Sequence, residues 1–156
     1  KIGVLSDTHG RQLSLRRAVR AMEDVDLVFH LGDLITDAIY IENTEETPVI
    51  YVPGNCDYYT DVNSSKLYKV NDNNIFLTHG HLYNVKYGYY DLIARAKDLN
   101  ADIVLFGHTH IPKIFKADDM LFINPGSLGI PPNGYKPTYA ILEIGDDKVK
   151  SHLKKL

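Results

Sequence analysis

The chain has 156 residues, a length that suits one domain with a substantial buried core, so we expect a single domain over residues 1–156. Hydrophobic residues make up 44% of the sequence and charged residues 24%, as in an ordinary globular protein. The formal net charge of −3 gives no electrostatic reason to expect stable binding to nucleic acid or to a membrane surface. No hydrophobic run approaches the ~20 residues that a membrane-spanning helix needs.

Two further features of the sequence concern location. Cys56 is the only cysteine, which excludes an intrachain disulfide and fits the reducing cytoplasm. The first hydrophobic run begins at Ile2, which leaves no room for a signal peptide. We therefore expect a cytoplasmic protein.

Five short hydrophobic runs, bounded by turn residues, predict buried strands. They span residues 2–6, 27–32, 49–54, 74–78 and 102–106. Between the first two runs, Leu15, Ala18 and Met22 recur at helical spacing, which predicts an amphipathic helix with Ser14 as its N-cap. The same spacing predicts a second helix within residues 89–99.

The pattern changes after residue 110. Three shorter runs, 113–117, 120–124 and 138–144, are separated by turn residues and predict antiparallel hairpins. The strand–helix–strand order of the earlier part predicts a mainly parallel sheet with right-handed crossovers. The sequence therefore predicts an α/β fold of two packed sheets with helices outside.

Each of the five earlier runs ends at residues that can bind a metal. Three ends carry pairs with one residue between the members: Asp7 and His9, His79 and His81, His108 and His110. Asp33 and Asn55 follow the other two runs. In an extended chain such pairs point to the same side, and ligands of open α/β sheets gather at the carboxyl ends of the strands. Any single pair is equally consistent with ordinary surface or hydrogen-bonded residues, but all of them together favour a shared metal site.

Seven side chains form the candidate ligand set: Asp7, His9, Asp33, Asn55, His79, His108 and His110. This is too many for one tetrahedral zinc ion, and it suits two divalent cations bridged by a carboxylate. Oxygen and imidazole ligands are compatible with Mn²⁺, Fe²⁺ or Zn²⁺. The positive charge of two such ions exceeds the negative charge of the two aspartates and a bridging hydroxide, so the centre would stay positive and attract phosphate. His30 lies inside a predicted strand and is expected to be a hydrogen-bonded core histidine.

The order of the motifs SDTHG, LGD, GNCD, THGH and FGHTH resembles the calcineurin-like metallophosphoesterase superfamily, whose pattern is D-x-H, G-D, G-N-[HCN]-[DE], H and G-H-x-H. The segment INPGSLGIPP resembles its small bacterial and archaeal phosphodiesterase branch. This resemblance implies a four-layer α/β/β/α sandwich of two mixed sheets and a homodimer or homotetramer. It also implies two divalent ions, with Mn²⁺ expected and Fe²⁺, Ni²⁺ or Zn²⁺ as alternatives.

The resemblance also implies individual roles. One ion would take Asp7, His9, Asp33 and His110, and the other Asp33, Asn55, His79 and His108, with Asp33 as the bridge. Asp57 would be an acceptor that orients a ligand. Many members have a histidine at the position of Cys56, where it is thought to protonate the leaving oxygen. A thiol is a poor substitute, so His81 or water would supply that proton, or nothing would.

These residues predict hydrolysis of a small phosphodiester by a hydroxide that bridges two metal ions, with His81, Asp57 and Asn55 as further participants. One alternative is a non-catalytic, metal-binding scaffold for protein interaction, like the retromer subunit that shares this fold. Another is a phosphomonoesterase or a nucleotide pyrophosphatase. The tyrosines of segment 83–90 could stack on a nucleobase, although packing is the favoured interpretation.

Overall fold

The computed structural model describes residues 1–22, 24–45, 47–146 and 148–156. It contains ten strands: β1 (Ile2–Leu5), β2 (Leu27–His30), β3 (Val49–Tyr51), β4 (Ser65–Val70), β5 (Asn73–Thr78), β6 (Ile103–Leu105), β7 (Lys113–Ala117), β8 (Met120–Asn124), β9 (Thr138–Ile144) and β10 (Val149–Lys155). The helices are α1 (Gln12–Ala21), α2 (Ile35–Thr44) and α3 (Tyr90–Asp98), with a short 3₁₀ helix η1 (His81–Tyr83).

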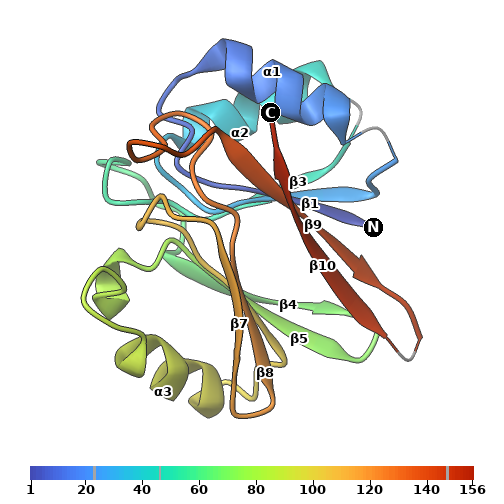
Figure 1. Ribbon diagram of the computed structural model, residues 1–156, viewed down its shortest axis with the longest axis vertical. Coiled ribbons are helices and arrows are strands. Elements are labelled where there is room, and N and C mark those ends of the chain that lie inside the picture. The colour runs from blue at the N-terminus through green and yellow to red at the C-terminus, as the bar shows by residue number, and fades with distance from the viewer. Residues whose placement is uncertain (23, 46, 147) are drawn as a thin grey trace.

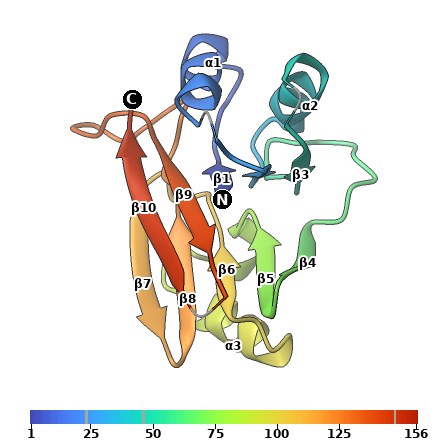
Figure 2. The ribbon, with the colours of Figure 1, turned by 90° about the vertical axis from the view of Figure 1, so that its right-hand side faces the viewer.

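The strands form two mixed sheets of five strands each (Figures 1 and 2). The first sheet has the order β10-β9-β1-β2-β3, in which β1, β2 and β3 run parallel. The second sheet has the order β4-β5-β6-β8-β7, in which β5, β6 and β8 run parallel. The predicted hairpin of β7 and β8 is confirmed, but β8 also pairs in parallel with β6, and β9 pairs with β1 as well as β10.

Three layers of buried side chains separate four layers of backbone, so the predicted α/β/β/α sandwich is confirmed. The layer between the sheets includes Val4, Phe29 and Leu105. A second layer packs the first sheet against α1 and α2, and a third packs the second sheet against α3. The two helices on one side and α3 on the other are visible in Figure 1. Neighbouring residues such as Val4 and Leu5 belong to different layers because side chains alternate along a strand.

Helix α1 is amphipathic as predicted and buries Leu15 and Ala18. The prediction of Ser14 as N-cap is wrong, because the helix begins at Gln12 and Ser14 lies inside its first turn. The helix begins two residues before Ser14, next to a contact with α2: the N–H of Gly10 donates to Asp37 Oδ2 at 3.0 Å. A tertiary contact therefore starts the helix, and no side-chain cap is present at its N-cap residue, Arg11.

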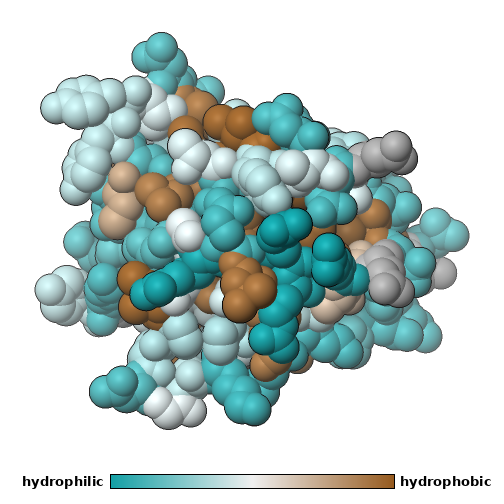
Figure 3. Space-filling model, turned by 90° about the horizontal axis from the view of Figure 1, so that it is seen from above, coloured by the Kyte–Doolittle hydropathy of each residue, from teal (hydrophilic) through white to brown (hydrophobic). Residues whose placement is uncertain are grey.

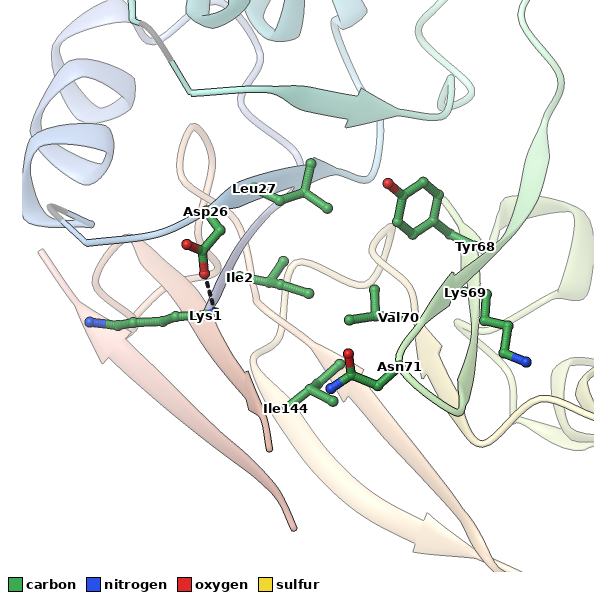
Figure 4. A pocket seen from close by; sticks show the side chains of 9 residues that line it. All are labelled: Lys1, Ile2, Asp26, Leu27, Tyr68, Lys69, Val70, Asn71 and Ile144. Carbon is green, nitrogen blue, oxygen red and sulfur yellow. Dashed lines mark hydrogen bonds and ion pairs between the residues drawn. The ribbon is translucent and has the colours of Figure 1, made fainter. Parts of the chain in front are cut away.

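The surface over α1 and α2 carries scattered hydrophobic residues among hydrophilic ones (Figure 3). None of the helices in the described part of the chain has the length and hydrophobicity to cross a membrane. A hollow of about 380 Å³ opens between the two sheets at the end where β1 and β2 begin (Figure 4). Its walls include Leu27, Tyr68 and Ile144, and none of the candidate metal ligands lines it.

Candidate metal centre

The carboxyl ends of parallel strands from both sheets meet at one edge of the sandwich (Figure 1). Asp7 and His9 follow β1, Asp33 follows β2, and Asn55 follows β3. The second sheet contributes the rest, with His79 after β5 and His108 and His110 after β6. The core between the sheets aligns these ends, so residues more than a hundred positions apart come into contact: the N–H of His108 donates to Asp7 Oδ2 at 3.1 Å.

His79 has a lone pair that faces oxygen atoms. Its Nδ1 lies 2.7 Å from the carbonyl oxygen of Leu31, which can only accept, so Nδ1 is protonated. Its Nε2 then faces Asn55 Oδ1 at 3.1 Å, Asp33 Oδ2 at 3.5 Å and Asp7 Oδ1 at 3.9 Å. Four acceptors around one point repel each other unless a positive charge lies among them.

A second group repeats this arrangement. Ligand atoms of Asp7, His9, Asp33 and His110 all lie within 4.8 Å of one another. His110 Nδ1 is 2.7 Å from the carbonyl oxygen of Ile130, and its Nε2 is 3.1 Å from Asp7 Oδ1. His9 Nε2 is buried without a hydrogen-bond partner in the described structure, and Asp7 Oδ1 has only its ion pair with His110. Buried polar atoms are costly when unsatisfied, so these residues fit a bound cation.

The ionisation of this group shows the same demand for positive charge. A hydrogen bond to Asp7 raises the pKa of His110, against the effect of its burial. Burial opposes ionisation of Asp7, but the hydrogen bond from His110 and the further interactions with His79 and His110 lower the pKa of Asp7 overall. His108 differs, because burial and the neighbouring His79 lower its pKa to about 4. Its ring lies 5.1 Å from that of His79 and is neutral at pH 7, as a metal ligand must be.

The backbone at these ligands is not extended, so the prediction that the pairs sit on an alternating strand is wrong. Strands β1 and β6 end at Leu5 and Leu105, before the ligands begin. Five candidate ligands have positive φ angles: Asp7 (53°), His9 (46°), Asp33 (58°), His108 (66°) and His110 (62°). Non-glycine residues rarely adopt this left-handed conformation, which costs about 1 kcal/mol each, and it clusters at functional sites.

Two glycines allow the loops to approach this closely. A Cβ atom on Gly107 would collide with Ser6 Oγ and would lie 2.8 Å from Asp7 Oδ2. A Cβ atom on Gly54 would collide with Asp33 Oδ1. The glycines of the FGHTH and GNCD motifs therefore leave room for the two carboxylates.

Asp57 positions Asp33 through the backbone. Its carboxylate accepts the N–H groups of Asp33 (3.0 Å), Leu34 (3.3 Å), Ile35 (2.8 Å) and Gly54 (2.8 Å). The predicted role as an acceptor is thus seen, but its recorded partners in the described chain are amides and not a histidine ring. It joins the loop after β2 to the loop after β3 and caps the start of α2.

His30 is the hydrogen-bonded core histidine that the sequence predicts. It is fully buried, and its Nδ1 accepts the N–H of Gly32 at 3.3 Å. Nε2 therefore carries the proton and donates to Thr8 Oγ1 at 3.1 Å, and Thr8 Oγ1 donates to the carbonyl oxygen of Asp33 at 3.2 Å. This chain of hydrogen bonds ties the loop after β1 to the loop after β2.

Burial lowers the pKa of His30 to about 4, from 6.5 in an unperturbed chain. Between these values the unfolded protein binds a proton that the folded protein does not. We expect the free energy of unfolding to fall as the pH drops from 6.5 toward 4, with His30 contributing up to about 3 kcal/mol. Urea unfolding across this pH range should show that the free energy of unfolding falls less steeply in His30→Asn than in the parent protein. The exposed His152→Asn should match the parent, and equal slopes for His30→Asn and the parent would contradict this account.

Two residues beside the centre stay candidates for contact with substrate. The His81 ring lies 5.4 Å from that of His79 and 6.1 Å from that of His108, and its Nδ1 is buried without a partner in the described structure. Burial and the neighbouring His79 lower the pKa of His81. Cys56 donates its N–H to Asp33 Oδ1 at 2.9 Å. Burial, followed by the charge of Asp33, raises the pKa of Cys56 to about 11, so it is a neutral thiol at pH 7.

Several positioning residues were missed in the sequence. Asn124, at the end of β8, donates to the carbonyl oxygen of Gly107 at 2.8 Å and to Thr109 Oγ1 at 3.0 Å. Ser127 Oγ donates to the carbonyl oxygen of Asp7 at 2.7 Å. Asn124 could have been found, because it also is a polar residue at the end of a parallel strand. Ser127 carried no such signal.

The tyrosines of segment 83–90 divide into two groups. Tyr83 packs edge-on against Phe76, with ring centroids 6.0 Å apart, and Tyr89 packs against Phe106 at 5.5 Å. These contacts confirm the packing interpretation for both residues. Tyr87 and Tyr90 are exposed.

Together, the four-layer sandwich and the acceptor-rich edge are the features of a metallophosphoesterase. Residues 1–147 match the family described as calcineurin-like phosphoesterase superfamily domain, so the chain belongs to this family.

The comparisons with individual proteins agree with this assignment. A probable metallophosphoesterase of Bacillus subtilis is 34% identical over 145 residues, which cover 92% of this chain and 84% of that protein. A phosphodiesterase of Methanocaldococcus jannaschii is 31% identical, over 88% of this chain and 93% of its own length. A crystal structure of a "predicted phosphoesterase" from Streptococcus pneumoniae superposes with a TM-score of 0.84 at 32% identity, covering 99% of this chain and 88% of that one.

A more distant structural likeness concerns the fold alone. Wild-type Vps29 of Entamoeba histolytica, in a complex with Zn²⁺, superposes with a TM-score of 0.77 at 22% identity. The match covers 99% of this chain and 98% of Vps29.

Proposed function

We propose that this protein is a metal-dependent phosphodiesterase that hydrolyses small phosphodiesters at the edge where its two sheets meet. The observation that carries the proposal is the crowding of His79 Nε2 by three oxygens, of Asn55, Asp33 and Asp7, together with the buried His9 Nε2, which has no hydrogen-bond partner in the described structure. The family assignment and the phosphodiesterase among the relatives support the reaction class.

Two ions would divide the ligands between them. The first set is Asp7, His9, Asp33 and His110, and the second is Asp33, Asn55, His79 and His108, with Asp33 shared. When bound, such ions lower the pKa of water, which provides the nucleophile, and neutralise the phosphoryl oxygens, with Mn²⁺ our first expectation. Backbone carbonyls hold a proton on Nδ1 of His79 and His110, so each ring would bind a cation through Nε2, which in His110 would replace the proton now shared with Asp7.

The remaining residues orient this set and contact the substrate. Asp57 and the His30–Thr8 hydrogen bonds fix the loop that carries Asp33. His81 is half-buried beside His79, with an unpartnered Nδ1 that suits a hydrogen bond to a phosphoryl or leaving oxygen. Neither Asp57 nor His81 needs to form a covalent intermediate with the substrate.

Removal of metal tests the proposal directly. The protein treated with a chelator should lose its hydrolysis of bis(p-nitrophenyl) phosphate, and readdition of divalent ions should restore it, Mn²⁺ best. Initial rates of nitrophenolate release at matched protein concentration measure this. The proposal fails if the chelated protein, shown by metal analysis to be metal-free, hydrolyses the diester as fast as the loaded protein.

Cys56 makes the leaving group important. A neutral thiol with a pKa of about 11 is a weak source of protons at pH 7. Diesters with nitrophenol leaving groups should therefore react much faster than dialkyl esters, which need protonation of the leaving oxygen. Because general acid catalysis is worth about 100-fold or more, Cys56→His should raise the alkyl ester rate selectively, whereas Cys56→Ser should not. Equal rates for both ester types in the parent protein would contradict the reasoning.

The alternative is a metal-binding scaffold for protein interaction. The fold likeness to Vps29 is compatible with it. The assay of the manganese-loaded protein separates the two, because a scaffold would bind ions without turnover. A panel that includes phosphomonoesters and nucleotide pyrophosphates addresses the other reaction specificities. A dimer or tetramer in the cytoplasm stays our expectation for its state in the cell.

A further inference from the structure

A hollow of about 450 Å³ is lined by Cys56, which follows the candidate ligand Asn55 in the chain. We call it the Cys56 hollow; its walls include Leu34, Ile35, Cys56, Asp57, Tyr58 and Tyr59. Cys56 connects the hollow to the candidate centre. It lines the hollow, and its backbone N–H donates to Asp33 Oδ1 at 2.9 Å. None of the seven candidate ligands lines the hollow, so a phosphate at those ligands would reach it through an ester group that extends past Cys56.

The hollow does not suit an anion. Among the described residues that line it, none is a lysine, arginine or histidine, and two are the aspartates Asp57 and Asp61. It includes the start of α2, where free backbone N–H groups would ordinarily attract an anion. Here Asp57 already accepts the N–H groups of Leu34 (3.3 Å) and Ile35 (2.8 Å). A second phosphate or a carboxylate would meet negative charge and no free donor from these two residues.

The walls instead offer aromatic and aliphatic surface. Tyr58 is 77% exposed and Tyr59 is fully exposed, so neither ring is committed to the core. Leu34, Ile35 and Cys56 are only half-buried. Tyrosine rings bind flat aromatic groups at low entropic cost because they have few rotatable bonds.

We propose that the Cys56 hollow binds an uncharged aromatic group that is esterified to the phosphate. The proposal rests on the proposed phosphodiesterase function, because it places the phosphate at the candidate metal ligands. It predicts that the protein prefers aromatic diesters to nucleotide pyrophosphates, whose second phosphate the hollow would reject.

Two non-hydrolysable probes test the hollow without turnover. Benzylphosphonate mimics an aryl phosphate, with a CH₂ group in place of the ester oxygen, and methylphosphonate lacks the ring. Calorimetric titration of the manganese-loaded full chain should give about five-fold tighter binding of benzylphosphonate, the effect of an aromatic contact. Tyr58→Ala combined with Tyr59→Ala should remove this difference and leave methylphosphonate binding unchanged. Tyr90 is an exposed tyrosine that lines another hollow on α3, and Tyr90→Ala should keep the difference in affinity between the two phosphonates.

The outcomes are distinguishable. If neither phosphonate binds the loaded protein, the candidate centre does not hold phosphate, and the proposed function and this inference both fail. If both bind equally, or if the Tyr58/Tyr59 double variant keeps the preference, the hollow inference alone fails. A charged probe gives a second test. The protein should bind 4-carboxybenzylphosphonate more weakly than benzylphosphonate, and Asp61→Lys should reduce this difference in affinity. Equal or tighter binding of the charged probe by the parent protein would overturn the inference.

Discussion

Asp33→Asn is expected to abolish ion binding and hydrolysis while leaving the metal-free protein at least as stable as the parent. The asparagine oxygen can keep the bond from the Cys56 N–H to Oδ1. Its amide group would replace Oδ2, which now faces His9 Nε2 and His79 Nε2 at 3.5 Å each. A new N–H group would donate to the lone pair of His79 Nε2 and satisfy it without a cation. Changes that merely misorient a metal ligand already cost about 10–100-fold, so we expect a loss of at least about 100-fold in ion affinity and turnover.

Calorimetric titration with Mn²⁺, the diesterase assay and urea unfolding of the metal-free proteins measure these effects. Satisfying buried acceptors should raise the free energy of unfolding by about 1 kcal/mol. Asp72→Asn, an exposed substitution in the turn between β4 and β5, is the matched control and should change none of the three quantities. Parent-like ion affinity and turnover in Asp33→Asn would exclude Asp33 as the shared ligand.

Asp57→Ala is expected to be the most destabilising single change near the centre. It removes the acceptor of four backbone N–H groups, at Asp33, Leu34, Ile35 and Gly54. Water can reach some of them because the site is only partly buried, so we expect a loss of about 3 kcal/mol in the free energy of unfolding. The loop that carries Asp33 would loosen at the same time, and ion affinity should fall by about 10–100-fold.

Urea unfolding and Mn²⁺ titration of the variant test both effects. Asp57→Asn keeps one oxygen but turns an N–H group toward donors, so it should be destabilised as well, to a smaller extent. Asp61→Ala is the control in the same loop, since Asp61 is exposed, and its effect should stay within about 0.5 kcal/mol. A variant Asp57→Ala as stable as Asp61→Ala would show that the four amides are satisfied without the carboxylate.

The fold was largely predictable because its signals are local. The runs that became β2 and β6 are short, hydrophobic and bounded by turn residues, and the helical spacing of Leu15 and Ala18 is equally direct. The rule that parallel strands share their carboxyl ends then brings Asp7, Asp33 and His108 to one edge. The candidate ligand set followed from that rule and from residue chemistry.

Other features depend on contacts that the sequence does not reveal. Helix α2 was not predicted, because its N-cap is Leu34, at a φ of 82°, and it buries a carboxylate, Asp37, on its inner face. Its cap comes from Asp57, which lies more than twenty residues further along the chain. The left-handed backbone at the ligands was also missed. The one-residue spacing of the pairs looks like strand alternation, whereas the true conformation is held by hydrogen bonds between loops, such as that from the His9 N–H to the Asp33 carbonyl.

The division of the candidate ligands between the two sheets also bears on how the molecule stays folded. The first sheet supplies Asp7, His9, Asp33 and Asn55, and the second supplies His79, His108 and His110. A cation bound there would link the two sheets through its coordination bonds, in addition to the hydrophobic core that packs between them. Its binding energy would resist their separation, and resistance to unfolding would rise with the ion concentration relative to the dissociation constant. Metal supply would then govern the lifetime of the protein as well as its chemistry.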